Sequence, residues 1–205
     1  MYRGHNPSPK SIYDYCPDVA QSPRVVVDMG AHQGAGYRQL RSMYPDATIH
    51  LVEPVRDCID ALRAASSQDE NVVIHPYAVG REDSITVINT FESDGRQSSN
   101  LYSDRGGVYG SPVKEVIRVA SYRQLPTHID LAKINIEAGE FDLLETDFFD
   151  RIDSFVMEAH NNLIPGKTWQ DVVKSLEGKF DLLTAGNLNY KYCFVMGVKI
   201  PSLSR

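Results

Sequence analysis

The chain has 205 residues and a formal net charge of −6, with 42% hydrophobic and 23% charged residues. This length predicts one domain with one sizeable core, and the composition excludes intrinsic disorder over most of the chain. No apolar run approaches the roughly 20 residues of a membrane-spanning helix, residues 1–10 do not resemble a signal peptide, and no segment is rich in Lys and Arg. We therefore expect a cytoplasmic protein without a broad nucleic-acid-binding surface.

The N-terminal residues 1–23 contain Pro7, Pro9 and Pro17 and predict an irregular arm, with one short helix over 11–15. The chain then alternates between short apolar strands and helical patterns. Strands are expected at 24–29, 48–52 and 71–75, and helices at 37–44 and 55–65. Such alternation predicts parallel strands that are joined by right-handed crossovers.

The middle of the chain interrupts this alternation with a β insertion over 84–119. Residues 84–90 and 113–119 alternate in polarity as half-buried strands do, and the polar, glycine-rich segment 93–111 predicts a mobile loop. The α/β pattern then resumes. Strands are expected at 131–136, 154–158, 180–184 and 192–198, and helices at 140–149 and 165–176. The last two strands flank the turn GNLNYK and predict a terminal hairpin.

A glycine-rich turn follows the first strand. It reads Asp28-x-Gly30-x-x-x-Gly34 and leads into a helix, so its backbone N–H groups are open to a ligand. His32 stands where a dinucleotide-binding turn has its second glycine, and no GK[ST] sequence follows as in a P-loop. Glu53 ends the second strand roughly 20 residues further on, where an acid can hold both ribose hydroxyls of an adenosine. Together the turn and the acid predict a nucleoside-binding site.

Several segments, in order along the chain, are similar to the motifs of one known family. They are VVVDMGAHQGAG from residue 25, LVEPV from 51, NVVIHPYAVG from 71, DLAKINIEAGEFDLLE from 130 and FVMEAHN from 155. The chain thereby resembles the FkbM family of S-adenosylmethionine-dependent methyltransferases. The resemblance implies an α/β, Rossmann-like class I methyltransferase fold, with a seven-stranded, mostly parallel sheet whose last strand is antiparallel. The predicted terminal hairpin agrees with this fold independently.

The resemblance also implies how S-adenosylmethionine would be bound. The methionine part would lie in the glycine-rich turn, the ribose at the acid that ends the second strand, and the adenine along the residues after the third strand. Ser98 and Ser99 fall where the family often has a serine pair near the cofactor, although they also read as ordinary loop serines. The expected cofactor-binding residues are Asp28, Gly30, Ala31, His32, Gly34, Glu53, Pro54, Ala78, Val79, Ser98, Ser99 and Asn135.

Two departures from the family pattern fall at the expected reaction centre. The family usually has aspartate where this chain has Asn135, and its EGAE motif reads Glu-Ala-Gly-Glu over 137–140. Asparagine cannot act as a carboxylate base, but it can orient a hydroxyl or the cofactor ammonium. The candidate bases are Glu137, Glu158 and His160, whose imidazole ordinarily titrates near neutral pH. Asn135 completes the expected catalytic group, and no metal is expected because carboxylates are few here.

We therefore expect an S-adenosylmethionine-dependent O-methyltransferase that acts on a hydroxyl of a small molecule, such as a sugar, glycolipid or polyketide-type metabolite. The altered segment 135–140 leaves open a protein that binds S-adenosylmethionine or S-adenosylhomocysteine without turnover. The acidic charge balance disfavours an RNA ribose methyltransferase, and the missing second glycine disfavours an NAD-dependent enzyme. The arm 1–23 and the loop 93–112 are expected to form a lid on a methyltransferase domain over 24–205. A homodimer is compatible with so short a chain.

Overall fold

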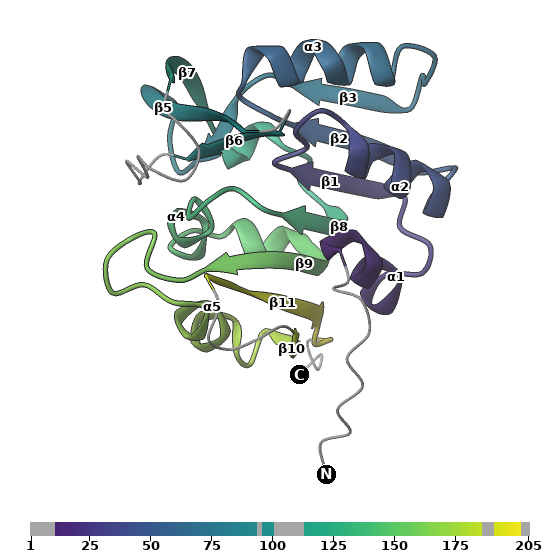
Figure 1. The fold of residues 1–205 in the computed structure, drawn as a ribbon. Coiled ribbons are helices and arrows are strands. Elements are labelled where there is room, and N and C mark those ends of the chain that lie inside the picture. Colours follow the sequence, from purple (N-terminus) through teal and green to yellow (C-terminus); the bar gives the residue numbers. More distant parts are fainter. Residues whose placement is uncertain (1–10, 94–95, 101–112, 186–190, 202–205) are drawn as a thin grey trace.

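A seven-stranded sheet forms the centre of the computed structural model (Figure 1), which describes residues 11–93, 96–100, 113–185 and 191–201. Its strands, in spatial order, are β10 (Phe180–Ala185), β11 (Tyr192–Lys199), β9 (Ile152–His160), β8 (Ile129–Ile134), β1 (Val25–Met29), β2 (Thr48–Val52) and β3 (Val72–His75). The neighbours from β9 to β3 pair in parallel, whereas β11 is antiparallel to both β9 and β10. This confirms the expected α/β fold, including the antiparallel last strand.

Helices cover both faces of this sheet, because successive strand residues point to opposite sides. Val26 packs in a core with the helices before β3, and Val27 packs in a second core with the helices after β8. The first set is η1 (Ile12–Tyr15), α1 (Cys16–Val19), α2 (Ala35–Met43) and α3 (Arg56–Ala65). The second set is α4 (Glu140–Leu144), η3 (Phe148–Arg151) and α5 (Trp169–Leu176). The molecule is therefore a three-layer sandwich.

Two helices differ from the sequence-based prediction. The helix expected over 140–149 ends at Leu144, and the Thr146 hydroxyl then accepts the backbone N–H of Phe148 and begins the separate turn η3. The helix expected from residue 165 begins only at Trp169. Gly166 has a left-handed φ of 80°, which breaks the helix, and a capping box between Thr168 and its N3 aspartate starts it.

The described part of the N-terminal arm is a component of the core, which corrects the expectation of an irregular lid. Ile12 is 6% exposed and Cys16 is fully buried, and both pack with α2 on the sheet face. The Tyr13 ring lies so close to Gly36 that a side chain there would collide with it. Apolar burial holds residues 12–19 down, so within the arm a lid function stays a prediction for residues 1–10, which lie outside the described residues. It also stays a prediction for the loop 93–112.

A second sheet lies beyond the carboxyl ends of β1 and β2 (Figure 1). Its strands, in spatial order, are β4 (Ala78–Gly80), β7 (Val113–Ser121), β5 (Ser84–Ser93) and β6 (Arg96–Asn100), and η2 (Tyr122–Gln124) follows β7. The predicted β insertion is thus present, but β6 corrects part of the expected loop 93–111, because backbone pairing with β5 orders it as a strand. Residues 94–95 and 101–112 lie outside the description. Ile88 and Ile117 turn inward and pack against Val55.

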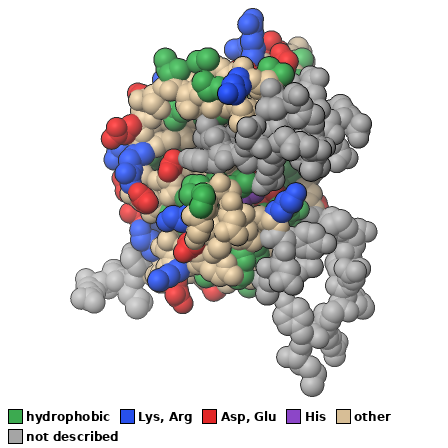
Figure 2. Space-filling view, turned by 60° about the vertical axis from the view of Figure 1, so that its left-hand side comes forward, with side chains coloured by type: hydrophobic (Ala, Val, Ile, Leu, Met, Phe, Trp, Pro, Cys, Tyr) green, Lys and Arg blue, Asp and Glu red, His purple; other side chains and the backbone are tan. Residues whose placement is uncertain are grey.

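The surface combines both charge signs. Figure 2 shows Lys and Arg side chains interspersed with Asp and Glu side chains over one face of the molecule. Across the described part of the chain, no helix has the length and apolar character needed to cross a membrane.

Candidate active site

One pocket opens where the carboxyl ends of β1, β2 and β8 meet the second sheet. Seven of the residues expected from the sequence line it: Gly30, Glu53, Pro54, Ala78, Val79, Asn135 and Glu137. The other lining residues are Val52, Tyr77, Ile88, Ile117, Ile136 and Gly139. Ligands of open α/β sheets bind at this edge, so the topology brings the predicted residues together at the expected place.

The glycine-rich turn is held close to β2 on one side and to the end of β8 on the other. The N–H groups of Gly30 and Ala31 both donate to the Val52 carbonyl of β2, at 3.0 and 3.1 Å. Gly30 has a φ of 80°, and a Cβ at this position would collide with the carbonyl oxygen of Asn135. Only glycine fits both the left-handed backbone and this close approach, and so the turn can follow the floor of the pocket.

Glu53 ties the turn to the end of β2. Its side chain is almost buried, with Oε2 accepting the N–H of His32 at 2.9 Å and Oε1 accepting the N–H of Val55 at 3.0 Å. Burial raises the pKa of this carboxyl, while the two backbone N–H donors oppose that rise. Each oxygen retains a further lone pair, which two ribose hydroxyls would require.

Asp28 has a different place from the one that the sequence predicted. Its carboxylate is fully buried behind the turn, where Oδ1 pairs with Lys133 Nζ at 2.9 Å and Oδ2 accepts the Tyr13 hydroxyl at 3.2 Å. Lys133 also donates to the Gly30 carbonyl at 2.9 Å. Burial alone would lower the pKa of Lys133, but the adjacent Asp28 charge outweighs burial and raises it. Asp28 therefore supports the turn from below and is not among the described residues that line the pocket.

Sequence reasoning missed Lys133 and Tyr77 as parts of the site. A lysine among the buried residues of strand β8 was a signal, because a buried ammonium requires a partner. Tyr77 lines the pocket, and its hydroxyl lies 2.8 Å from Nδ1 of His75, whose Nε2 lies 2.9 Å from Nδ1 of His50. The pairing of the neighbouring strands β2 and β3 brings these three rings together, and no local sequence pattern predicts their contact.

His160, one of the expected bases, lies among three carboxylates. Its Nδ1 is 3.2 Å from Glu140, and its Nε2 is 3.5 Å from both Glu137 and Glu158. Burial would lower the pKa of the imidazole, but the hydrogen bonds to Glu140 and Glu158 and the charge of Glu137 raise it to about 10. A pKa raised in this way favours a histidine that keeps its proton at neutral pH and positions the carboxylates over one that acts as the base.

We expect this cation to make stability depend on alkaline pH. The pKa of His160 is about 10 in the fold against 6.5 ordinarily, so its contribution is fully present below pH 6.5 and is lost as pH rises through 10. Unfolding free energies of wild type and His160→Gln should converge from pH 7 to 10. The pKa of His75 shifts in the opposite direction, because burial lowers it to about 4. An NMR titration of His160 with a midpoint near 6.5 would contradict this assignment and restore the histidine as a base.

Asn135 joins the pocket to this carboxylate group. Its Nδ2 donates to Glu158 Oε2 at 3.3 Å, while its Oδ1 is buried and has no hydrogen-bond partner within the described ranges. Glu137 and Ala138, which follow in the turn, have left-handed φ angles of 50° and 79°. A buried carbonyl oxygen without a donor is costly unless a ligand supplies one. The amide therefore leaves one buried acceptor without a partner in a residue that lines the pocket.

The remaining predicted residues have supporting positions. Ala31 is buried in the core, His32 contributes its backbone N–H to Glu53, and Gly34 is the left-handed N-cap of α2. Ser98 and Ser99 belong to β6, paired with β5, and their side chains lie outside the description.

The sheet order, the glycine turn and the acid at the end of β2 together define a class I methyltransferase. A family model described as the methyltransferase FkbM domain matches residues 28–181. The chain therefore belongs to the FkbM methyltransferase family and is an S-adenosylmethionine-dependent methyltransferase. A comparison with curated proteins finds no match.

Solved structures with a similar fold include methyltransferases of several kinds. The precorrin-6y C5,15-methyltransferase of Geobacter metallireducens is 11% identical, with a TM-score of 0.54 over 92% of this chain and 86% of that one. An rRNA methylase of Streptococcus thermophilus is also 11% identical, with a TM-score of 0.54 over 92% and 94%. Fibrillarin of Aeropyrum pernix, in complex with natively bound S-adenosyl-L-methionine, is 12% identical, with a TM-score of 0.51 over 87% and 67%. At such identities the likeness concerns the fold and leaves the acceptor open.

Proposed function

We propose that this protein transfers a methyl group from S-adenosylmethionine to a hydroxyl oxygen of a small molecule, such as a sugar, glycolipid or polyketide-type metabolite. One observation carries the proposal. The Gly30 turn, Glu53 and Asn135 line a single pocket, and the carboxylate of Glu158 adjoins it through the Asn135 amide. A cofactor site and an acceptor of the hydroxyl proton are thus side by side.

The pocket residues fit the cofactor part by part. The Gly30 turn admits the methionine part, and the unpartnered Asn135 Oδ1 matches the ammonium group, which offers only donors. Glu53 would accept the two ribose hydroxyls, and Ala78 with Val79 would lie along the adenine. When bound, S-adenosylmethionine supplies a methyl group on a sulfonium that needs no metal to leave.

Glu158 is the base in this proposal. The Asn135 amide holds one of its oxygens at 3.3 Å, and the His160 imidazolium lies 3.5 Å from the other. These two donors fix the carboxylate, which takes the hydroxyl proton while the acceptor oxygen bonds to the methyl carbon and the carbon–sulfur electron pair returns to sulfur. The products are a methyl ether, S-adenosylhomocysteine and protonated Glu158.

The site supports RNA ribose methylation less well. Lys133 is 2% exposed and paired with Asp28, so its ammonium is not available to a substrate. Basic side chains on the face in Figure 2 alternate with acidic ones, whereas RNA-binding surfaces are continuous and basic.

Calorimetric titration with S-adenosylhomocysteine and S-adenosylmethionine tests the cofactor site. We expect Glu53→Gln to weaken binding about 10- to 100-fold, because a hydrogen bond to a charged group contributes roughly 1.5–3 kcal/mol. Glu70→Gln, an exposed change of the same kind, should leave affinity unchanged. Wild-type protein that binds neither compound would overturn the assignment.

Glu158→Gln tests the proposed base. This variant should retain affinity for the cofactor but lose methyl transfer to a hydroxylated acceptor. Wild-type protein that binds the cofactor but methylates no acceptor would favour a non-catalytic protein.

A further inference from the structure

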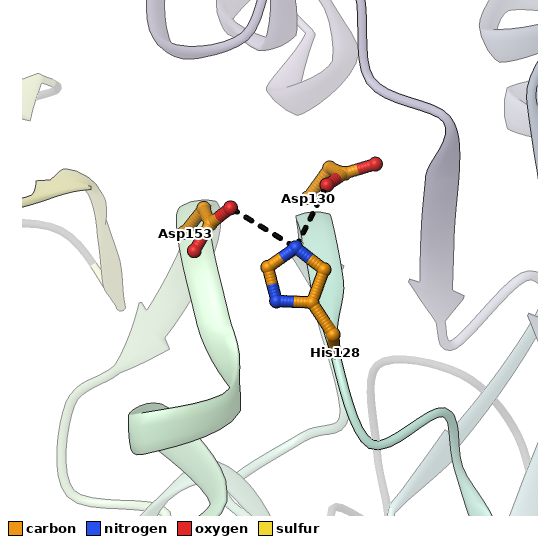
Figure 3. A group of neighbouring side chains, drawn as sticks. All are labelled: His128, Asp130 and Asp153. Carbon is orange, nitrogen blue, oxygen red and sulfur yellow. Dashed lines mark hydrogen bonds and ion pairs between the residues drawn. The ribbon is translucent and has the colours of Figure 1, made fainter.

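Three donor side chains meet at the amino edge of the large sheet, away from the cofactor pocket (Figure 3). His128 precedes β8, Asp130 is the second residue of β8, and Asp153 is the second residue of β9. Nε2 of His128 lies 3.0 Å from Oδ1 of Asp130 and 3.2 Å from Oδ2 of Asp153. The parallel pairing of β8 and β9 brings the two aspartates to the same edge, and the three donor atoms lie within 4.8 Å of one another.

Asp130 is oriented before any ligand arrives. Its Oδ2 accepts the backbone N–H groups of Arg24 and Val25 at 2.7 and 2.8 Å, where β1 begins. These two bonds turn Oδ1 toward His128. Metal ligands are typically held in this way by contacts outside the coordination sphere.

The two distances from His128 Nε2 to the aspartate oxygens match the spacing of ligand atoms in a first-row metal centre. Bonds of about 2.0–2.2 Å from Zn²⁺ to imidazole nitrogen and carboxylate oxygen place neighbouring ligand atoms roughly 3.0–3.5 Å apart. The proton on Nε2 of His128 can point at only one of the two carboxylates at a time, so two anions share one donor. A divalent cation at their centre would contact all three side chains and compensate both carboxylates.

The group is also accessible from solvent. The side chains of His128 and Asp153 are 60% and 50% exposed. The lining of a neighbouring hollow includes Asp130, Asp153, Arg24 and Ser154. An ion can therefore enter, and water can complete its coordination.

We propose that His128, Asp130 and Asp153 bind one first-row divalent cation, with Zn²⁺ as the best match to a mixed set of nitrogen and oxygen donors. Mg²⁺ and Ca²⁺ are disfavoured because they prefer oxygen ligands alone. The ion joins the beginnings of β8 and β9 directly and the beginning of β1 through Asp130. Its role is structural, because the reaction site lies at the opposite edge of the sheet.

The test is calorimetric titration of the metal-free full chain, without an affinity tag, with ZnCl₂ at neutral pH. Wild type should bind one Zn²⁺ per chain and gain several degrees of thermal stability. His128→Gln and Asp153→Asn should each weaken binding at least about tenfold while keeping the metal-free melting temperature near that of wild type. Asp60→Asn is the matched control, because Asp60 is an aspartate of similar exposure in an ion pair.

Co²⁺ distinguishes coordination by the group from loose attraction of the ion. Inner-sphere binding should produce visible absorption bands in wild type and Asp60→Asn that are absent from both site variants. If Zn²⁺ does not saturate at one equivalent, or if the site variants bind it as wild type does, the three side chains form an ordinary ion pair and the proposal is wrong. Affinity for S-adenosylhomocysteine should be the same with and without Zn²⁺, so this result is independent of the cofactor assignment.

Discussion

Lys133→Met is expected to destabilise the protein by about 3–5 kcal/mol, because it leaves the buried Asp28 carboxylate without its cation. Both side chains are almost completely buried, and the pair joins β8 to β1 at 2.9 Å. Methionine preserves most of the volume of lysine, so the loss reports the charge and not a cavity. The measurement is the free energy of unfolding from urea titration at neutral pH.

Two further variants separate this cause from others. Asp28→Asn combined with Lys133→Met removes both charges and should recover much of the loss. Lys179→Met breaks a pair of nearly the same length, 2.8 Å to Asp150, but both partners are about half exposed. That change should cost less than about 1 kcal/mol. Equal losses at Lys133 and Lys179 would show that the buried pair contributes no more than a surface contact.

Gly30→Ala is expected to weaken both the fold and the cofactor site. A side chain at φ 80° costs about 1–2 kcal/mol in backbone strain, and the added methyl group also collides with the Asn135 carbonyl. The turn must then move away from β8, which displaces the N–H groups and the Asn135 amide that line the pocket. We expect the free energy of unfolding to fall by more than the strain alone and the affinity for S-adenosylhomocysteine to fall at least about tenfold.

Gly166→Ala is the matched control for this prediction. Gly166 has the same φ of 80°, but a Cβ there meets nothing within 4 Å. It should therefore lose only the strain energy and bind S-adenosylhomocysteine as wild type does. If the two variants behave alike in urea titration and calorimetry, the contact between the turn and Asn135 has no role in the site.

The sequence predicted the parts of the site whose chemistry is local. Gly30 and Glu53 were recognisable because a glycine turn and an acid each have to follow directly after a strand. Asn135 and Glu137 were expected in the site because the resemblance to the FkbM family places their segment at the reaction centre. Parallel strands place such ends at one edge, so a correct strand order was sufficient to bring these four residues into one pocket.

Protonation states could not be predicted in this way. The ordinary pKa of histidine made His160 a reasonable base, but the pKa in the fold depends on Glu140 from α4 and Glu158 from β9, together with Glu137 from the turn after β8. The spacing in sequence does not give these distances. The contacts of Asp28 could not be predicted either, because its partners come from the N-terminal arm and from β8.

The sequence by itself determined the order along the chain of the seven strands of the large sheet, the family and the place of the pocket. Apolar periodicity, glycine turns and acids at strand ends act within a few residues, and the handedness of crossovers then limits the topology. The tertiary structure alone decided that the arm belongs to the core, that Lys133 pairs with Asp28 and that His160 lies among three carboxylates. Burial and charge pairing are set by neighbours that are distant along the chain, and a side chain has neither until the chain has folded.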